Sequence, residues 1–432
     1  MRLKLNNILK IANADIELGG LTVITGVNDS GKSTIGKVLF TTLKTIRNVN
    51  QVNKLSTLDK IRSNLYAIFS ILNSKGIKSS FEESFSKLII DLLEKNKDIK
   101  DFSNTILEES EKSFLPNRNI ELLKKILNEI EIAISDFYNP NILVQKEFDN
   151  ISKSEFIESL NSFGEKFSSI EFYDDTIDVN DSKVILNFED GNLAKTIISG
   201  NSSVEDITYI ESPVYLHILN TLRFSTFVPT DTFRKISLGL QKGYTPYHLA
   251  DMAEKITSNQ QTDENEELLN EICSLIDGDF KIDKKDNQLY FHKNGNKIPT
   301  VSVASGIKSF GVLLRLIETD NISPTKILVL DEPEIHLHPE WQIKFCRIII
   351  ELITKGVPIV ISTHSPDFLQ GLRYYAAAKG IEQEVVYYLA EEGDDSLSNL
   401  RNVTDNLNDV FSLLAAPLQS VMNVDAVRNT MK

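Results

Sequence analysis

An eight-residue segment near the start of the chain constrains its fold more than any other feature. Residues 26–33 read GVNDSGKS and fit the pattern G-x-x-x-x-G-K-[ST]. The β-rich run 21–25 precedes this segment, and apolar residues then recur at helical spacing from Ile35 to Leu43. The sequence therefore predicts a buried strand, a glycine loop and a helix in succession, which is an arrangement that wraps phosphate groups.

Each fixed position of this loop has a chemical task. Glycines let the backbone approach phosphates with its N–H groups pointing inward, and the start of the following helix adds positive potential. Lys32 is expected to neutralise β- and γ-phosphate oxygens, and the Ser33 hydroxyl to ligate Mg²⁺. The alternative is a chance glycine turn. The expected contacts with ATP come from the loop and the first helical residues: Gly26, Asn28, Ser30, Gly31, Lys32, Ser33 and Thr34.

A second motif follows a wholly apolar run late in the chain. Residues 327–332 read ILVLDE and predict a buried strand that delivers two carboxylates to the edge where open α/β sheets bind ligands. Asp331 is expected to hold Mg²⁺, and Glu332 to orient and deprotonate the attacking water. The alternative is a solvated acidic turn.

A further helix start lies between these two motifs. Residues 303–308 read VASGIK, and Ser305 and Gly306 stand where the helix is expected to begin, so the N–H groups there could form a second anion site. In an ATPase with one nucleotide per chain, such a site is useful if it closes over the γ-phosphate held by another subunit. The alternative is an ordinary N-cap serine.

Histidines supply the remaining candidates. His364 follows the buried run VPIVIST and should reach the same sheet edge, where it could bond the γ-phosphate, while the alternative is a structural histidine. His336 and His338, together with Glu334, invite a zinc site. No cysteine or further histidine lies nearby in a spacing that would complete such a site.

The chain divides into three segments by pattern. We expect residues 1–45 to form the N-terminal part of an ATPase head, 46–167 a largely helical insertion, and 168–432 the C-terminal part of the head. The insertion contains the helical runs ESFSKLIIDLLEKN and IELLKKILNEIEIAISDF, and no heptad pattern persists over four repeats. The segment therefore predicts several packed helices and not a long coiled-coil arm.

Residues 168–432 return to a strand-rich pattern. KVILNFEDGNLAKTII predicts a hairpin around Asp190-Gly191, and ITYIES predicts a strand before a helix that begins at Pro213. Residues 265–277 predict a helix. EVVYYLA is the last expected strand, and a short helical tail follows it.

Composition limits the partners and the compartment. The 432 residues have a formal net charge of −15, which gives no broad basic footprint for nucleic acid, although a local lysine-lined groove for DNA stays open. No run approaches the roughly 18 apolar residues of a membrane span, and the start lacks the apolar core of a signal peptide. We therefore expect a cytoplasmic protein without a membrane partner. Cys273 and Cys346 are expected to be buried free thiols.

The order of these motifs resembles the ABC-type ATPase head shared by SMC-like, RecF-like and OLD-family proteins. GVNDSGKST is similar to Walker A, ASGIK to a degenerate signature motif, ILVLDE to Walker B, PEIHLHP to the D-loop and STHSP to the switch-histidine loop. DEPEIHLHP is typical of the OLD-like branch, and YIESP with TPYHLADMAEKI resembles small ATPases encoded beside bacterial phage-defence effectors. The resemblance covers most of the chain outside the helical insertion and implies an α/β fold, with a mixed β-sheet flanked by helices.

The resemblance also implies a head-to-head homodimer, or a higher homo-oligomer, that sandwiches each ATP between two subunits. Carried over, this places Lys32, Ser33, Asp331, Glu332 and His364 on one subunit, and Ser305 of the other subunit opposite them. Three departures are visible. The signature is not the full LSGGQ, no Q-loop glutamine can be assigned, and the 68 residues after His364 are expected to be too few for the nuclease domain that follows the ATPase in OLD proteins.

The expectation that this chain carries no effector domain shapes the functional hypothesis. An ATPase of this type is expected to control a separate effector, such as a nuclease or toxin, when a phage component is sensed, as in two-component defence systems such as PARIS or Septu. One alternative is a RecF-like DNA repair or loading ATPase. Another is a scaffold that binds ATP to assemble and hardly hydrolyses it.

Overall fold

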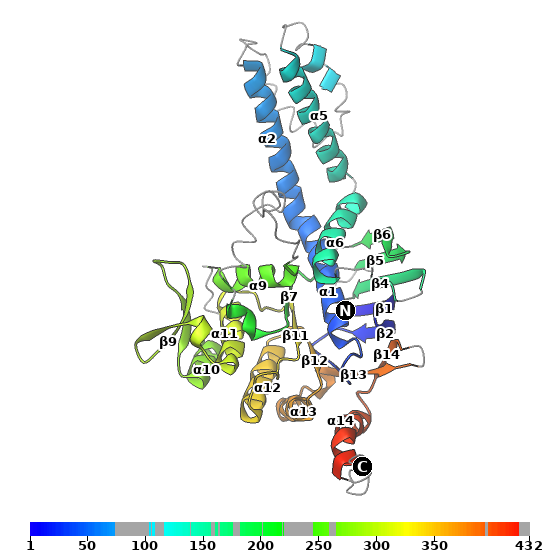
Figure 1. Cartoon of the computed structure of the whole chain (residues 1–432). Coiled ribbons are helices and arrows are strands. Elements are labelled where there is room, and N and C mark those ends of the chain that lie inside the picture. The colour runs from blue at the N-terminus through cyan, green and yellow to red at the C-terminus, as the bar shows by residue number, and fades with distance from the viewer. Residues whose placement is uncertain are drawn as a thin grey trace, which may run out of the picture. The chain divides into compact units, whose positions relative to one another are not determined.

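The computed structural model of the chain forms two compact units (Figure 1). Unit 1 comprises Met1–Lys44 and Asn150–Lys432, and unit 2 comprises Thr45–Asp149. The expected domain boundaries after residues 45 and 167 stay a prediction. The residues that the structure describes are 1–73, 103–104, 106–108, 116–138, 140–156, 160–162, 165–175, 182–200, 202–217, 219, 245–258, 265–393 and 396–422.

An 11-stranded mixed sheet is the framework of unit 1, in the order β6-β5-β4-β1-β2-β14-β13-β3-β12-β11-β7. Five neighbouring strands form its parallel half: β13 (Val385–Glu392), β3 (Leu21–Gly26), β12 (Ile359–Thr363), β11 (Lys326–Asp331) and β7 (Asp206–Ile210). Five others form its antiparallel half: β6 (Asn192–Ser199), β5 (Ser182–Glu189), β4 (Phe167–Asp174), β1 (Arg2–Ile8) and β2 (Ile11–Glu17). Between the halves, β14 (Ser398–Asn402) runs parallel to β2 and antiparallel to β13.

Differences in burial explain why the strands of one half are continuous apolar runs and those of the other half alternate. β3, β12 and β7 are buried at every position, as apolar runs covered on both faces require. In contrast, β4 and β5 alternate between buried and half-buried side chains, which is the pattern of strands with one covered face. The predicted hairpin at Asp190-Gly191 is confirmed, and both of these residues have positive φ.

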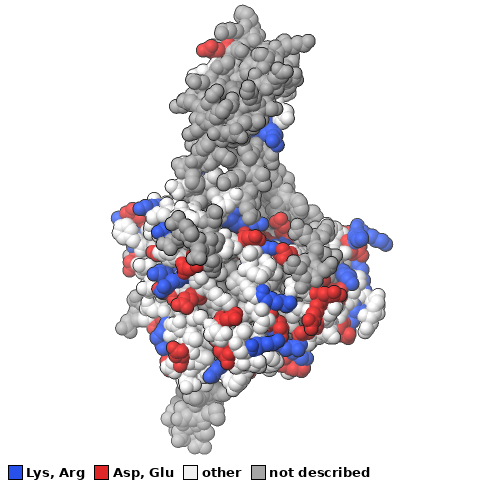
Figure 2. Space-filling view, turned by 180° about the vertical axis from the view of Figure 1, so that it is seen from behind, with Lys and Arg blue, Asp and Glu red and all other residues white. Residues whose placement is uncertain are grey.

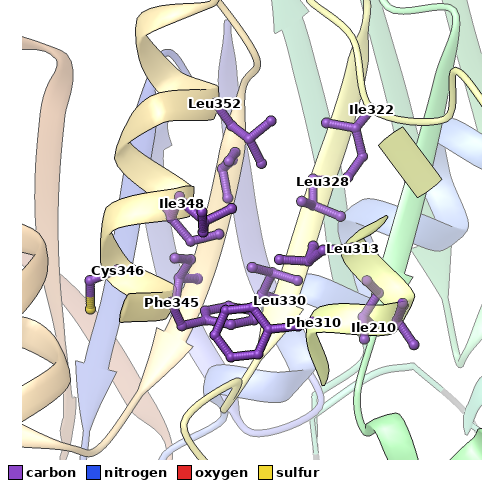
Figure 3. Close-up of a cluster of buried hydrophobic side chains, with 14 of the residues drawn as sticks. Ile210, Phe310, Leu313, Ile322, Leu328, Leu330, Phe345, Cys346, Ile348 and Leu352 are labelled. Carbon is purple, nitrogen blue, oxygen red and sulfur yellow. The ribbon is translucent and has the colours of Figure 1, made fainter. Parts of the chain in front are cut away.

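Helices flank the parallel half. α1 (Lys32–Arg47) follows β3 and packs against one face, since a Cβ atom on its Gly36 would lie 2.9 Å from Val329 Cγ1 of β11. A large apolar cluster covers the other face, where Leu328 and Leu330 of β11 meet Phe310, Leu313 and Phe345 (Figure 3). The α-helices that contribute most of its residues are α9 (Tyr247–Thr257), α10 (Glu266–Ile276), α11 (Ser305–Glu318), α12 (Pro339–Thr354) and α13 (Pro366–Lys379). The predicted α/β fold, with a mixed sheet flanked by helices, is confirmed.

A small antiparallel sheet packs beside α11. Its strands are β8 (Asp279–Ile282), β9 (Leu289–Lys293) and β10 (Asn296–Pro299). The rings of Phe280 and Phe291 lie 5.0 Å apart, and a Cβ atom on Gly311 of α11 would lie 2.4 Å from Phe280 Cε2. Because glycine alone permits this approach, the small sheet is held directly against the helix that begins at Ser305.

Unit 2 consists of helices in its described part. A short π-helix (Asn48–Asn53) leads into α2 (Lys54–Asn73), and α5 (Asn117–Tyr138) packs beside α2. Their shared core includes Ile61 and Leu65 of α2 and Leu123 and Ile130 of α5. α6 (Pro140–Phe156) then leads back into unit 1. The predicted helix at IELLKKILNEIEIAISDF is thus confirmed, whereas ESFSKLIIDLLEKN lies outside the described residues.

Several details differ from the sequence prediction. The helix expected at Pro213 is a 3-10 helix over Pro213–His217 in the described chain, and shorter 3-10 helices span Thr300–Ser302 and Glu382–Glu384. EVVYYLA is not the last strand, because β14 follows it before the helical tail α14 (Leu407–Met422). Cys346 is a buried free thiol as predicted, but Cys273 is only half-buried.

No helix of the described residues is both long and apolar enough to cross a membrane.

Candidate functional site

The glycine loop leaves β3 in a backbone path that requires its glycines. Gly26 has a φ of 152° and Gly31 a φ of 81°. A Cβ atom at Gly26 would lie 2.8 Å from the Ala390 carbonyl oxygen of β13, and one at Gly31 would lie 2.5 Å from Ile11 Cδ1. The loop therefore fits between its neighbours only with glycine at both positions.

Lys32 folds back over this loop. Its Nζ donates to the carbonyl oxygen of Val27 at 2.7 Å and to that of Gly26 at 3.2 Å. Burial lowers the pKa of Lys32, although the negative charges of Glu332 and Asp331 oppose that shift. The ammonium group is thus held at the loop by neutral acceptors that a phosphate oxygen could replace.

The other loop residues differ in exposure. Asn28 is exposed, whereas Ser30 is buried and its hydroxyl donates to the Val27 carbonyl oxygen at 2.8 Å. Ser33 and Thr34 are half-buried in the first turn of α1. Ser30 therefore shapes the loop from within, while Asn28 faces solvent.

Parallel strand pairing brings the predicted motifs to one edge. Asp331 at the end of β11 stands opposite Ser362 of β12, and Thr363 stands opposite Thr25 of β3. The glycine loop, the two acids and the segment with His364 thus leave three adjacent strands at the same edge.

Both oxygens of Asp331 are held by hydroxyl groups. Oδ2 accepts from the Tyr209 hydroxyl at 2.9 Å, and Oδ1 accepts from the Ser362 hydroxyl. Tyr209 is buried, and burial together with the charge of Asp331 raises its pKa well above the ordinary value, so its hydroxyl stays a proton donor. Tyr209 and Ser362 could not be predicted as partners of Asp331 from sequence, because only the pairing of β7 and β12 with β11 brings them to it.

Glu332 and His364 face each other next to Asp331. His364 Nδ1 lies 3.0 Å from Glu332 Oε1. The Glu332 backbone has a φ of 46°, and its N–H donates to the Ser362 carbonyl oxygen at 3.0 Å. The chain therefore turns sharply at Glu332, and the hydrogen bond to β12 holds that turn in place.

Glu334 lies beneath this pair and is buried. Its Oε1 accepts from the Thr363 hydroxyl at 2.5 Å and from the His364 N–H at 3.2 Å. Burial raises the pKa of Glu334, and these hydrogen bonds oppose the shift. From sequence, Glu334 was a candidate zinc ligand only, and its bonds to Thr363 and His364 were not predicted.

That zinc alternative receives no support from the geometry. His338 is the N-cap of α12, where its ring accepts from the Glu340 N–H at 3.4 Å. Among the described residues, no group of three or more His, Cys, Asp or Glu side chains is arranged to hold a metal ion.

Ser305 begins α11 but is not its N-cap. Ala304 occupies the cap position without a side-chain hydrogen bond, so the N-cap alternative for Ser305 is wrong. A Cβ atom at Gly306 would lie 3.4 Å from Leu337 Cδ2, which places this helix start against the segment after Glu332. Within the described chain, Ser305 makes no hydrogen bond to residues 26–34.

A cavity of about 180 Å³ borders the two acids on the side of α11. Its lining combines Asp331 and Glu332 with Glu211, Ser309 and apolar side chains from β7, β11 and α11. Glu211 follows β7 and forms an ion pair with Lys37 of α1 at 3.5 Å.

Behind this cavity, α9 contributes a buried histidine between two carboxylates. His248 Nδ1 lies 2.8 Å from Glu155 Oε2, and His248 Nε2 lies 3.3 Å from Glu211 Oε2. Burial alone lowers the pKa of His248, but the two carboxylates outweigh it and the net shift is upward. The contact with His248, opposed by partial burial and supported by Lys37, lowers the pKa of Glu211 to about 2.

Four charged side chains form a second buried cluster nearby. Lys44 Nζ lies 2.8 Å from Asp206 Oδ1 and also contacts Asp251. Lys255 Nζ lies 3.0 Å from both Asp206 Oδ2 and Asp251 Oδ2. All four side chains are under 10% exposed. This cluster, defined as Lys44, Asp206, Asp251 and Lys255, joins α1, β7 and α9.

A phosphate loop, paired acids on a parallel strand and a neighbouring histidine together define a P-loop nucleotide-binding protein of the ATPase class. The sequence model of the AAA ATPase domain family matches residues 1–369, and the chain belongs to that family.

Two curated relatives match shorter segments. The chain is 30% identical to the OLD nuclease of Thermus scotoductus over 122 residues, which cover 27% of this chain and 23% of the nuclease. It is 29% identical to Septu protein PtuA of Bacillus thuringiensis over 105 residues, 24% of each chain. The matched segments thus span about a quarter of the length of each relative. Together with the family match, they confirm the predicted resemblance to OLD-like ATPases and to ATPases of phage-defence systems.

Solved structures give a more distant likeness. The SMC head domain from Thermotoga maritima is 12% identical with a TM-score of 0.38, and covers 93% of this chain and 98% of its own. An SMC head bound to the C-winged helix domain of ScpA is 12% identical with a TM-score of 0.41, and covers 93% and 96% of the two chains. These scores add nothing to the fold described above.

Proposed function

We propose that this chain hydrolyses ATP with Mg²⁺ in a site shared by two copies of the chain, and that the hydrolysis cycle controls a separate effector protein. The observation that carries the ATPase part is the convergence of Lys32, Asp331, Glu332 and His364 at one edge of the parallel half. Phosphoryl transfer depends mainly on positioning and charge stabilisation, and this edge supplies both.

The donor set at this edge suits Mg²⁺. Hard cations take oxygen ligands, and the Ser33 hydroxyl and Asp331 carboxylate are oxygen donors next to the phosphate loop. The hydroxyls of Tyr209 and Ser362 fix the orientation of the Asp331 carboxylate. When bound, Mg²⁺ neutralises charge on the phosphate oxygens.

The chain's own residues then divide the chemistry. Lys32 exchanges its carbonyl acceptors for β- and γ-phosphate oxygens, with the N–H groups of the glycine loop around them. Glu332 orients the attacking water and accepts its proton. His364 lies against Glu332 at 3.0 Å, from where it can hold that carboxylate and bond the γ-phosphate.

Ser305 is assigned to the opposite subunit. Ser305 and Gly306 begin α11, and among the described residues no acceptor outside the helix is bonded to their N–H groups, which favours an anion there. Ser305 makes no hydrogen bond to residues 26–34 of its own chain within the described residues. A second copy placed head to head would bring this helix start over the γ-phosphate, which is the arrangement that the resemblance implies.

Steady-state ATP hydrolysis over a range of protein concentrations tests the composite site. Specific activity should rise with concentration as dimers form. Glu332→Gln should lower kcat by about 10²–10⁴-fold, because it removes the general base. Ser305→Arg should abolish activity, because it blocks the opposite face of the γ-phosphate. Glu351→Gln, on α12 and paired with Lys379, is the matched control and should retain activity.

Fluorescent ATP binding separates the possible failures. Glu332→Gln should still bind ATP, whereas Lys32→Ala should not. Equal hydrolysis by wild type and Glu332→Gln, at any concentration, would overturn the assignment of the base. Binding without hydrolysis in the wild type would favour the scaffold alternative, in which ATP serves only to assemble the protein.

Control of an effector is supported by the partial matches to OLD nuclease and Septu protein PtuA, whose names denote a nuclease and a component of Septu. We assign docking of the effector to unit 2, where Tyr66 of α2 is 60% exposed. A photo-crosslinking amino acid at Tyr66 should capture a protein encoded beside this chain in its native cells. The same probe at Tyr374 of unit 1, which is 64% exposed, is the control. Capture at Tyr374 alone would place the docking surface in unit 1.

A DNA-directed ATPase is the competing function. DNA should then stimulate hydrolysis, and binding should weaken steeply with salt. The net charge of −15 opposes this function, and we expect hydrolysis to be unchanged by added duplex or single-stranded DNA.

A further inference from the structure

Glu334 occupies an environment that is costly for a carboxylate. Its side chain is 4% exposed, and one of its oxygens, Oε2, is buried without a hydrogen-bond partner in the part of the chain that the structure describes. A buried carboxylate that is only partly hydrogen-bonded usually costs stability, and an apolar residue of similar volume often removes that cost. The reason for a glutamate here must therefore lie in what its other oxygen does.

That other oxygen holds the segment that carries His364. Oε1 accepts from the Thr363 hydroxyl at 2.5 Å and from the His364 N–H at 3.2 Å. The Thr363 hydroxyl in turn accepts from the Ser365 N–H at 3.1 Å. One carboxylate oxygen thus organises three consecutive residues at the point where β12 ends.

The direction of the His364 ring follows from this anchor. His364 is half exposed, with its side chain 41% accessible, so packing alone does little to orient the ring. Its Nδ1 lies 3.0 Å from Glu332 Oε1 and 4.0 Å from Glu334 Oε1. The hydrogen bond to the His364 N–H fixes the backbone at this residue and therefore the direction of its Cα–Cβ bond. That direction determines whether Nδ1 can reach Glu332.

We propose that Glu334 is a positioning residue for hydrolysis: its Oε1 anchors the backbone of His364 so that the imidazole faces Glu332. This inference rests on the proposed ATPase function and assigns Glu334 a role through His364, without contact to the nucleotide. Misplacement of a catalytic group by about 1 Å can cost about 10²-fold in rate, so an anchor of this kind has measurable consequences.

Two substitutions separate hydrogen bonding from charge. Glu334→Gln keeps an acceptor oxygen for Thr363 and His364 and removes the negative charge. Glu334→Ala removes both. Glu351→Ala on α12, which breaks the ion pair with Lys379, is the matched control for loss of a glutamate near the same helix.

The first measurement uses the protein without nucleotide. The chain has six histidines, so the ring carbon signals of histidine-labelled protein are few, and the His364 signal is identified by its loss in His364→Asn. Both Glu334 variants lose a charge 4.0 Å from Nδ1, but only Glu334→Ala also loses the anchor, so we expect the signal to move further in Glu334→Ala than in Glu334→Gln and to keep its wild-type position in Glu351→Ala. Equal positions of the His364 signal in Glu334→Ala and Glu334→Gln would overturn the proposal.

The second measurement is the separation of kcat from ATP binding. Glu334→Ala should lower kcat by about 10–100-fold and change ATP affinity much less, since the phosphate loop that holds the nucleotide is left intact. Glu334→Gln should restore most of kcat. A Gln variant as impaired as the Ala variant would show that charge, and not anchoring, is what matters, and would also overturn the proposal.

The two measurements distinguish this inference from the proposed function. If the wild-type chain binds ATP and does not hydrolyse it, the proposed ATPase function fails and kcat cannot be compared among the variants. The position of the His364 signal still shows whether Glu334 anchors the ring. Thermal unfolding serves as the folding control. Because Glu334 is a buried and partly unsatisfied carboxylate, Glu334→Gln should unfold at the same temperature as wild type or above it.

Discussion

The two halves of the large sheet have five strands each, but only the parallel half has residues of the candidate site after its strands. In the parallel half, β3, β11 and β12 end at the same edge, and each is followed by residues of the candidate site. In the antiparallel half, neighbouring strands end at opposite edges, so no edge collects the residues that follow them. Strand direction therefore decides which half can assemble a site from separate motifs.

The same difference governs burial. Parallel strands here are covered on both faces, so the polar groups among them must find partners inside the protein. The buried cluster of Lys44, Asp206, Asp251 and Lys255 is an example. The antiparallel strands keep one face accessible, and their ion pairs, such as Arg2 with Asp15, remain in contact with water. Identical substitutions should therefore have unequal effects in the two halves.

The largest contrast is expected for a lysine or arginine changed to methionine. Lys44→Met should destabilise the protein by roughly 3–5 kcal/mol, because it leaves Asp206 and Asp251 buried with one ammonium between them. Arg2→Met, in the antiparallel half, should leave the urea unfolding midpoint unchanged, because Asp15 returns to water. The comparison between the halves fails if both variants unfold at the same urea concentration.

A smaller contrast is expected for alanine substitutions at adjacent strand positions. Ile327 and Leu328 of β11 are both 1% exposed, on opposite faces, so each change to Ala should cost about 2–5 kcal/mol. In β5, Leu186 is fully buried, so Leu186→Ala should lower the free energy of unfolding by as much. Ile185 is half-buried, so Ile185→Ala should lower it by about 1 kcal/mol or less. Urea unfolding of the four variants measures these values. Equal losses at Ile185 and Leu186 would show that the outer face of β5 is covered too.

These burial patterns also explain how much of the fold could be predicted. Continuous apolar runs such as ILVL and VIT identify buried parallel strands, and the Asp190-Gly191 pair identifies the hairpin, because both signals are local. β14 (Ser398–Asn402) was missed because SNLRN has almost no apolar pattern, and its place between β2 and β13 depends on residues far away in the sequence.

The candidate site divides in the same way. Lys32, Asp331 and Glu332 could be predicted because each belongs to a motif whose chemistry is encoded in consecutive residues. Tyr209 and Glu334 could not be assigned their contacts. The hydroxyl of Tyr209 reaches Asp331 across a strand pairing, and Glu334 reaches His364 across the β11–β12 edge. Partners of this kind become visible only when the strand order is known.

The smallest expected effect is on the pH dependence of stability. It comes from His248 of α9, which lies against the parallel half. The pKa of His248 is raised in the folded protein, so its contribution to stability is fully present below the unfolded value of about 6.5 and is lost as the pH rises through the folded value. Glu211 acts in the opposite direction, since its pKa of about 2 makes its contribution present above the unfolded value and lost as the pH falls.

Thermal unfolding between about pH 6 and about pH 9 should therefore show a steeper decline for wild type than for His248→Gln, which cannot lose a proton in this range. Glu155→Gln should give an intermediate slope, because it removes the carboxylate nearest to the ring, 2.8 Å from Nδ1, and keeps Glu211. Parallel curves for wild type and His248→Gln would mean that the pKa of His248 is the same in the folded and the unfolded protein. The carboxylates of Glu155 and Glu211 would then stabilise the charged imidazole only enough to offset the effect of its burial.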